Sequence, residues 1–199
     1  MFVPRKILQE KLRKILEEDI GQGDITTSLI VPEESAAEAE VTAKEPGIVA
    51  GILEAEVLLE NLGLHVEVLV DDGERIKKRQ KLIRISGNAR TILSAERTLL
   101  NIISRMSGIA TTTRNIVEKL RQAKLSAKVA CTRKTAPGLL YFDKKAVLIG
   151  GGDTHRLHLD DMILIKDNHV KIAGSLKKAV DKARGKASFS KKIEVEVTN

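Results

Sequence analysis

Two short apolar runs, residues 128–132 and 162–165, constrain the fold of this chain more than any other feature, because each passes directly into cations. Arg133 and Lys134 follow the first run, and Lys166 follows the second. Runs of this length and composition predict β-strands, and the residues between them predict a helix and a glycine loop. Parallel strands of a βα sheet end at one common edge, where ligands bind. The sequence therefore predicts that these cations converge on a single ligand.

The residues between the runs add the glycine triplet Gly150–Gly152 and the pair His155 and Arg156. Cations crowded at one edge repel one another, and a ligand with several negative groups offsets this through hydrogen bonds of about 1.5 to 3 kcal/mol each. The alternative is a set of unrelated surface charges beside loops. The glycines allow the backbone to approach either a ligand or a helix closely, and the sequence does not choose between these.

Composition limits the class of protein. With 199 residues, of which 42% are hydrophobic, the chain can bury one sizeable core or two modest ones. It has no apolar run of about 18 residues, and its N-terminal segment has the pattern of an amphipathic helix rather than of a signal peptide. We therefore expect a soluble, cytoplasmic protein without a membrane partner. Cys131 is the only cysteine, which excludes an intramolecular disulfide and a cysteine-based zinc site.

The net charge of +7 is concentrated in one segment, residues 171–192, which holds eight Lys or Arg and one acid, Asp181. Most of this segment, residues 175–186, predicts an amphipathic helix. We interpret it as a solvated basic helix face rather than a surface for nucleic acid or membrane. The aromatic content of 2% leaves little on which bases could stack.

Hydrophobic periodicity divides the chain into two parts. The first part predicts helices and short strands of a small α+β domain, namely a helix at 4–18, a connector at 21–35, strands at 38–43 and 47–51, a helix at 53–62, and strands at 66–70 and 81–85. Asn88 is a predicted N-cap for the next helix, which Ser107 and Gly108 should end; another helix is expected at 111–123.

The second part, from residue 126 onward, predicts a strand at 128–132, a helix at 139–148, a strand at 162–165, the basic helix and a strand at 193–197. The predicted fold class is α/β, with an N-terminal α+β sandwich-like domain at 1–107 and the first part of an incomplete βα barrel at 108–199. A whole barrel takes roughly 200 to 250 residues, so we expect the later strands to lie outside this chain and the chain alone not to turn over.

Several motifs together carry a family resemblance. TRKTAPG, GGGDTHR and LIKDNH, preceded by EDIGQGDITT and SAERTLLNIISRMSGIATTT and followed by IEVEV, resemble the quinolinate phosphoribosyltransferase family, the carboxylating nicotinate-nucleotide pyrophosphorylases. The resemblance covers essentially the whole chain. It implies that quinolinate and 5-phosphoribosyl 1-diphosphate are converted to nicotinate mononucleotide, diphosphate and CO₂ in NAD biosynthesis, with Mg²⁺ as cofactor.

The resemblance also assigns residues. It implies that quinolinate and the sugar phosphate are bound by Thr132, Arg133, Lys134, His155, Arg156, Lys166 and Glu196, with Arg97 reaching in from the neighbouring subunit of at least a dimer. Lys166 and Glu196 are the implied catalytic residues, and Glu196 is also the implied Mg²⁺ ligand. On pattern alone, Arg97 is a solvated residue of a helix. The chain departs from the family at Leu140, where an arginine is common, and at residues 144–147, where a KYAV-like run is common.

Other interpretations remain open at this point. A molybdenum-transport-associated relative shares the TRK and HR motifs, although the lysine of LIKDNH favours the phosphoribosyltransferase, and an anion- or nucleic-acid-binding module is a different class of answer. Asp160 and Asp161 are expected in a turn rather than on a metal, and His155 with His158 lacks further zinc ligands. Cys131 is expected to pack within a strand, and His169 to fix the loop after Lys166.

Overall fold

The computed structural model describes residues 3–197 and divides the chain into two compact units. Unit 1 comprises residues up to Cys131 together with Thr135–Thr154, and unit 2 comprises Thr132–Lys134 and the residues from His155 onward. The elements of unit 1 are α1 (Arg5–Ile20), α2 (Ile25–Ile30), β1 (Ala36–Thr42), β2 (Gly47–Ile48), α3 (Ile52–Asn61), β3 (His65–Val68), β4 (Arg75–Ile76), β5 (Lys81–Asn88), α4 (Ala89–Gln122) and α5 (Leu140–Ile149). Those of unit 2 are β6 (Ile163–Ile165), α6 (Asp167–Ala173), α7 (Leu176–Lys186) and β7 (Ile193–Val195).

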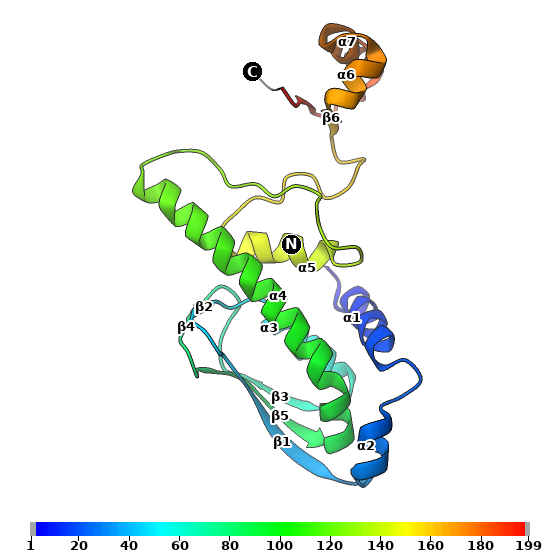
Figure 1. The fold of residues 1–199 in the computed structure, drawn as a ribbon, viewed down its shortest axis with the longest axis vertical. Coiled ribbons are helices and arrows are strands. Elements are labelled where there is room, and N and C mark those ends of the chain that lie inside the picture. The colour runs from blue at the N-terminus through cyan, green and yellow to red at the C-terminus, as the bar shows by residue number, and fades with distance from the viewer. Residues whose placement is uncertain (1–2, 198–199) are drawn as a thin grey trace. The chain divides into compact units, whose positions relative to one another are not determined.

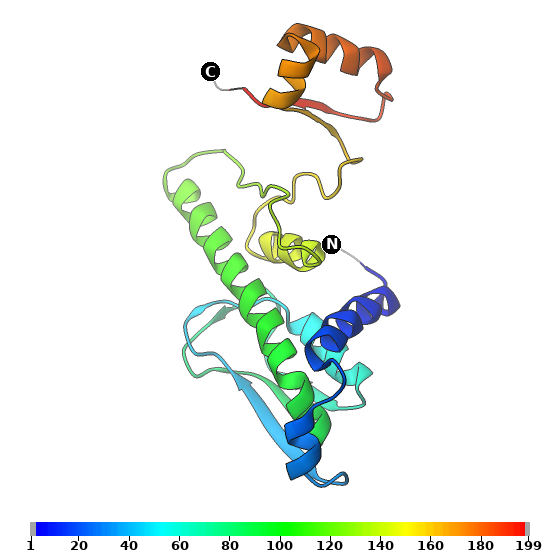
Figure 2. The same cartoon turned by 45° about the vertical axis from the view of Figure 1, so that its right-hand side comes forward.

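Unit 1 is built on a three-stranded antiparallel sheet in the order β1-β5-β3, with helix α4 running across one of its faces (Figures 1 and 2). Side chains of a strand alternate between the two faces of its sheet. Val41, Ile83 and Ile85 accordingly enter the core, whereas Glu40 and Arg84 lie on the exposed face. The α+β character predicted for this part of the chain is confirmed.

Helix α4 is one continuous helix of 34 residues, so the predicted break at Ser107 and Gly108 is wrong. The Ser107 hydroxyl accepts a hydrogen bond from the Ala50 N–H, and the Thr111 hydroxyl accepts one from the Ile48 N–H. These bonds satisfy the backbone beside the short strand β2 and hold α4 against it. A glycine inside a helix costs about 1 kcal/mol relative to alanine, which this packing outweighs.

The segment 21–35, which we expected to be a connector, contains helix α2. Asp24 caps it by accepting a hydrogen bond from the Thr27 N–H, and its second carboxylate oxygen accepts one from the Ser94 hydroxyl of α4. These hydrogen bonds, with Thr27 first, lower the pKa of Asp24. The predicted N-cap at Asn88 is confirmed, since its side chain accepts from the Thr91 N–H.

The first apolar run forms a single parallel bridge, Ala130 with Asp153, and not the predicted strand. The Cys131 N–H donates to the Asp153 carbonyl and the Asp153 N–H to the Val129 carbonyl. The glycine triplet allows the chain beside this bridge to pack closely against other elements. A Cβ on Gly150 would lie 2.6 Å from the Ala110 carbonyl oxygen of α4, and one on Gly152 would lie 2.8 Å from side-chain atoms of Thr113 and Val147. Gly150 and Gly152 thus allow close packing against α4, which is one of the two possibilities left open by the sequence.

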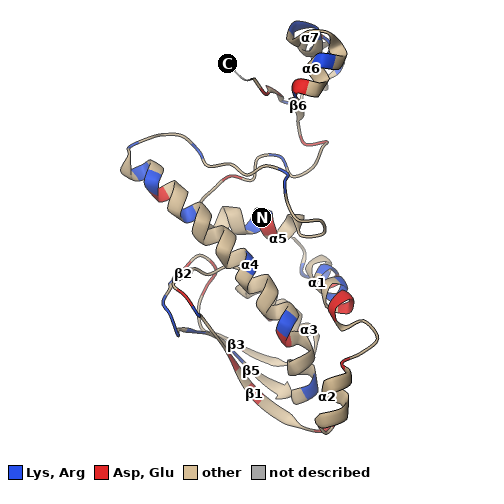
Figure 3. Ribbon diagram, in the orientation of Figure 1, with Lys and Arg blue, Asp and Glu red and all other residues tan. Residues whose placement is uncertain are grey.

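Unit 2 contains a parallel pair of strands, β6 and β7, connected by helices α6 and α7. Residues 163–165 pair in register with residues 193–195, as the βα pattern predicts. Helix α7 begins where Ser175 accepts a hydrogen bond from the Lys178 N–H, and Figure 3 marks its basic residues. Within residues 3–197, no helix combines the length and the apolar character needed to span a membrane.

Candidate anion-binding site

The carboxyl ends of β6 and β7 bring a lysine and a glutamate together in unit 2. Lys166 follows β6, Glu196 follows β7, and the Lys166 Nζ atom lies 2.9 Å from a carboxylate oxygen of Glu196. The Glu196 N–H donates to the Ile165 carbonyl at 2.9 Å, which continues the strand pairing to this point. The two predicted catalytic residues are therefore neighbours, and both side chains remain accessible to a ligand.

Strand β7 also contributes to a second pair of side chains, His155 and Glu194. His155 Nε2 lies 2.8 Å from a carboxylate oxygen of Glu194. Because a carboxylate only accepts, the hydrogen of this bond is on Nε2. His155 has a φ of 51°, in the left-handed region that non-glycine residues rarely adopt and that is often retained at functional positions.

Sequence reasoning did not assign Glu194. The signal was present in the IEVEV motif, because Glu194 lies in β7 and Glu196 directly follows it with its N–H still bound to β6, and residues two apart in an extended segment point to the same face. Both acids of the IEVEV motif therefore meet predicted substrate-binding residues, His155 and Lys166.

His169 fixes the start of helix α6, as predicted. Its Nδ1 accepts a hydrogen bond of 2.9 Å from the Lys166 N–H. This bond fixes the direction of the backbone at Lys166. It therefore also fixes the position of the Lys166 Cα atom, from which the side chain extends. His169 acts on the site through backbone geometry.

The remaining predicted ligand residues of unit 2 lie on two segments. Thr132, Arg133 and Lys134 are exposed, and the Thr132 hydroxyl accepts a hydrogen bond from the Lys134 N–H at 3.1 Å. Arg156 lines a hollow of about 510 Å³ together with Leu159, Asp160, Met162, Ile163, Leu164, His169 and Lys191. Arg133, Lys134 and Lys166 are not among the residues that line this hollow, so the convergence of all the cations in one pocket stays a prediction.

Arg97 lies in unit 1, on helix α4, and its side chain is exposed. Among residues 3–197, no hydrogen bond or ion pair joins it to another side chain, in contrast to Arg105 two turns further on. Arg105 forms a forked pair with Asp143, with nitrogen–oxygen distances of 2.7 and 2.9 Å, and the hydrogen bonds to Asp143 raise the Arg105 pKa.

Asp160 and Asp161 belong to a turn. The Asp161 carboxylate accepts hydrogen bonds from the N–H groups of His158 and Leu157, which lower its pKa. Potential ligand atoms of His158, Asp160 and Asp161 lie within 4.8 Å of one another, but all three residues are exposed and the turn explains their grouping.

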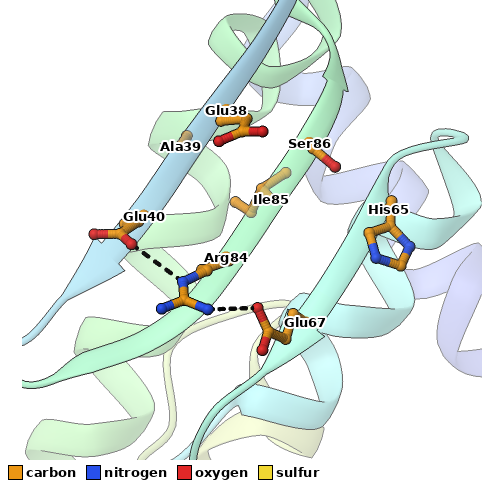
Figure 4. A pocket seen from close by; sticks show the side chains of 8 residues that line it. All are labelled: Glu38, Ala39, Glu40, His65, Glu67, Arg84, Ile85 and Ser86. Atoms are coloured by element: carbon orange, nitrogen blue, oxygen red, sulfur yellow. Dashed lines mark hydrogen bonds and ion pairs between the residues drawn. The ribbon is translucent and has the colours of Figure 1, made fainter.

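A polar hollow of about 580 Å³ lies on the exposed face of the sheet in unit 1 (Figure 4). Its central guanidinium, Arg84, donates to Glu40 and to Glu67 on the two flanking strands. A hydrogen bond from Lys81, and to a smaller extent the one from Arg84, lowers the pKa of Glu40. These charges pair with one another, so this hollow does not compete with unit 2 as the anion site.

The parallel strands β6 and β7, joined by helices α6 and α7, together with the mixed unit 1 define a protein of the α/β class. Comparisons with known proteins identify the family. The family model described as "Quinolinate phosphoribosyl transferase, C-terminal domain" matches residues 109–199, and "Quinolinate phosphoribosyl transferase, N-terminal domain" matches residues 24–107. The chain belongs to the quinolinate phosphoribosyltransferase family.

Comparisons with individual proteins agree with the family match. The chain is 49% identical over 188 residues to a probable nicotinate-nucleotide pyrophosphorylase [carboxylating] of Methanocaldococcus jannaschii, covering 94% of this chain and 65% of that protein. It is 40% identical over 190 residues to the protein of the same name from Methanothermobacter thermautotrophicus, covering 96% and 68%. The crystal structure of NadC from Streptococcus pyogenes superposes with a TM-score of 0.90 at 34% identity, covering all of this chain and 70% of that one. The chain thus spans about two thirds of the length of these relatives.

Proposed function

We propose that this chain carries the quinolinate-binding part of an enzyme that transfers phosphoribose from 5-phosphoribosyl 1-diphosphate to quinolinate, releasing diphosphate and CO₂. The observation that carries the proposal is the family match on both domains, which includes all the motifs that supply cations to unit 2. The product, nicotinate mononucleotide, would serve NAD synthesis.

Quinolinate is a planar ring with two adjacent carboxylates. Forked guanidinium donors suit planar carboxylates, and ammonium groups suit them as point charges. We assign Arg133, Lys134, Arg156 and Lys166 to binding of quinolinate and the sugar phosphate, with Thr132 and His155 as hydrogen-bonding groups. The accessibility of Lys166 and the ordering of His155 by Glu194 support this assignment.

In the proposed reaction, charge develops first on the ribose and then on a carbon of the ring. The ring nitrogen forms a bond to the anomeric carbon while the bond from that carbon to the diphosphate oxygen breaks, and the diphosphate leaves with the electron pair. The ribose gains positive charge in this step, which the Glu196 carboxylate would stabilise. The carboxylate next to the ring nitrogen then leaves as CO₂, and its electron pair stays on the ring carbon until a proton is added. Lys166 would stabilise that negative charge by preorganised electrostatics.

Mg²⁺ in proteins binds one or two carboxylates together with phosphate oxygens and waters. Glu196 and Glu194 offer such oxygens at alternate positions of one strand end, so the residues present fit this ion. When bound, Mg²⁺ would neutralise charge on the diphosphate. Because Lys166 lies 2.9 Å from a Glu196 oxygen, the lysine and the ion would share or compete for this carboxylate.

We also propose that Arg97 completes the site of a neighbouring subunit in at least a homodimer. Its exposure and the lack of a side-chain partner among residues 3–197 support this, because a guanidinium is otherwise free to meet a carboxylate of another molecule. The oligomeric state is testable by sedimentation, with Arg97→Ala expected to keep the assembly and lose substrate affinity.

The decisive experiment is a calorimetric titration with quinolinate, with nicotinate, which lacks the second carboxylate, as the matched ligand. We expect quinolinate to bind at least tenfold more tightly, and Arg133→Ala to remove this difference because one forked contact is lost. Equal affinity for the two ligands would contradict the proposed function.

A further inference from the structure

Lys144 is a fully buried lysine in helix α5 whose ammonium binds backbone carbonyls. Its Nζ donates to the Thr154 carbonyl at 2.6 Å and to the Cys131 carbonyl at 3.3 Å. Cys131 and Thr154 each follow a residue of the isolated bridge between Ala130 and Asp153. The amine therefore joins the two segments immediately beyond the backbone bridge between them.

Cys131 and Thr154 are also the residues at which the chain leaves unit 1. The residues that come next along the chain are Thr132–Lys134 on one segment, and His155 and Arg156 on the other. The predicted substrate cations thus follow directly, through covalent bonds, from two carbonyls held by one ammonium group.

Burying an ammonium costs several kcal/mol of desolvation, and an apolar side chain of similar volume would avoid this cost. An ammonium on a flexible stem has three donors and can bind several carbonyl oxygens that come from different segments. The neighbouring Lys145 is buried too, but it binds the carboxylates of Glu54 and Asp72 and neither of these carbonyls. The two adjacent lysines therefore have separable roles.

We propose that Lys144 is a positioning residue for the substrate site, which keeps the ends of the two cation-bearing segments side by side. The carbonyls of Cys131 and Thr154 meet at its amine, so the segments leave unit 1 at a fixed separation. Without the amine, these ends would keep the two backbone hydrogen bonds of the bridge and the weak hydrogen bond of 3.6 Å from Cys131 Sγ to the Thr154 carbonyl, but would lose the ammonium group that binds both carbonyls. The consequence for substrate binding rests on the proposed function, whereas the consequence for the backbone does not.

The first test needs no ligand. Lys144→Met keeps the volume of the side chain and removes the donors. We expect the amide hydrogens of Cys131 and Asp153 to exchange with deuterium at least tenfold faster in this variant, measured by NMR relative to the Ile48 amide in the same molecule. Lys145→Met is the matched control; because it destabilises unit 1 as a whole, including Ile48, the exchange rates of Cys131 and Asp153 relative to that of Ile48 should not rise in it. If Lys144→Met fails to fold, Lys144→Gln, which retains a shorter donor group, is compared in the same way.

The second test is a quinolinate titration of the same variants at a temperature at which circular dichroism shows all of them folded. We expect the Kd of Lys144→Met to rise at least tenfold and that of Lys145→Met to stay within twofold of the unmodified chain. Unchanged amide exchange in Lys144→Met would overturn the role of Lys144 whether or not quinolinate binds. Faster exchange with an unchanged Kd would overturn its effect on the site, and an unmodified chain that binds no quinolinate would instead overturn the proposed function.

Discussion

The buried ion pair between Glu54 and Lys145 should contribute strongly to the stability of unit 1. The Glu54 side chain is fully buried, and the Lys145 Nζ atom lies 2.8 and 2.9 Å from its two oxygens and 3.2 Å from an oxygen of Asp72. The Tyr141 hydroxyl donates a further hydrogen bond of 2.8 Å to Glu54. Removing one partner of such a pair leaves an uncompensated buried charge.

The magnitude follows from these contacts. Lys145→Met leaves two acids near one another and removes two of the three hydrogen bonds that Glu54 accepts, so we expect a loss of about 3 to 5 kcal/mol in the free energy of unfolding. Glu54→Gln keeps an acceptor for Tyr141 and leaves Lys145 paired with Asp72, so its expected cost is smaller, about 1 to 3 kcal/mol. In the double variant, the Glu54 charge is removed together with Lys145 and only Asp72 loses its ammonium partner, so we expect the cost of the double variant to fall short of the sum of the single costs by about 2 kcal/mol.

Urea unfolding followed by tyrosine fluorescence measures these values. Tyr141 is the only tyrosine, and the chain has no tryptophan, so the signal reports the surroundings of the ion pair itself. Single-variant costs that add to the cost of the double variant within about 0.5 kcal/mol would refute the coupling and, with it, the reasoning that the pair acts as a unit.

Three further predictions concern packing and pH. Gly150→Ala should destabilise unit 1 by about 1 to 3 kcal/mol, because its Cβ would lie 2.6 Å from the Ala110 carbonyl oxygen; Gly185→Ala, which meets no atom within 4 Å, is the control in urea unfolding. Burial and then Glu54 raise the pKa of Tyr141, so its absorbance titration should lie above the ordinary value of 10.0. Since the folded chain then holds this proton more tightly than the unfolded chain, stability should fall as the pH rises past 10, and Tyr141→Phe should lessen that fall. Backbone hydrogen bonds from His158 and Leu157 lower the pKa of Asp161 below 3.8, so NMR should show the turn intact at pH 5 and lost as the pH falls through that lowered pKa, and Asp161→Asn should abolish this transition.

Periodic elements with clear ends could be predicted from the sequence. Helix α7, for example, begins at the Ser175 cap and keeps its apolar spacing, and β6 and β7 form the parallel pair that their βα spacing indicates. Propensity failed where tertiary contacts decide. Ser107 and Gly108 suggest a helix end, but hydrogen bonds between α4 and the backbone at Ile48 and Ala50 keep the helix continuous. The division of the chain at residue 107 stays a prediction.

The first apolar run failed as a strand for a related reason. Strand formation depends on a neighbour that pairs along its length, and within residues 3–197 only Asp153 pairs with residues 129–131. The alternation of apolar residues cannot report how many partners are present, because it encodes which faces are buried and not which edges are paired.

The same distinction separates the predictable from the unpredictable part of the site. The cationic residues of the site could be predicted from residue type, because a ring with two carboxylates and a diphosphate both need cations to bind them. The residues that position the binding side chains, Glu194 and Lys144, could not be predicted in this way, because neither needs to touch the substrate. Glu194 acts on His155 through one hydrogen bond, and Lys144 binds carbonyls that any residue type would supply. Substitutions at these two positions should therefore change substrate affinity through geometry, and Lys145, on the same helix, is the neighbour beside which Lys144 should be tested.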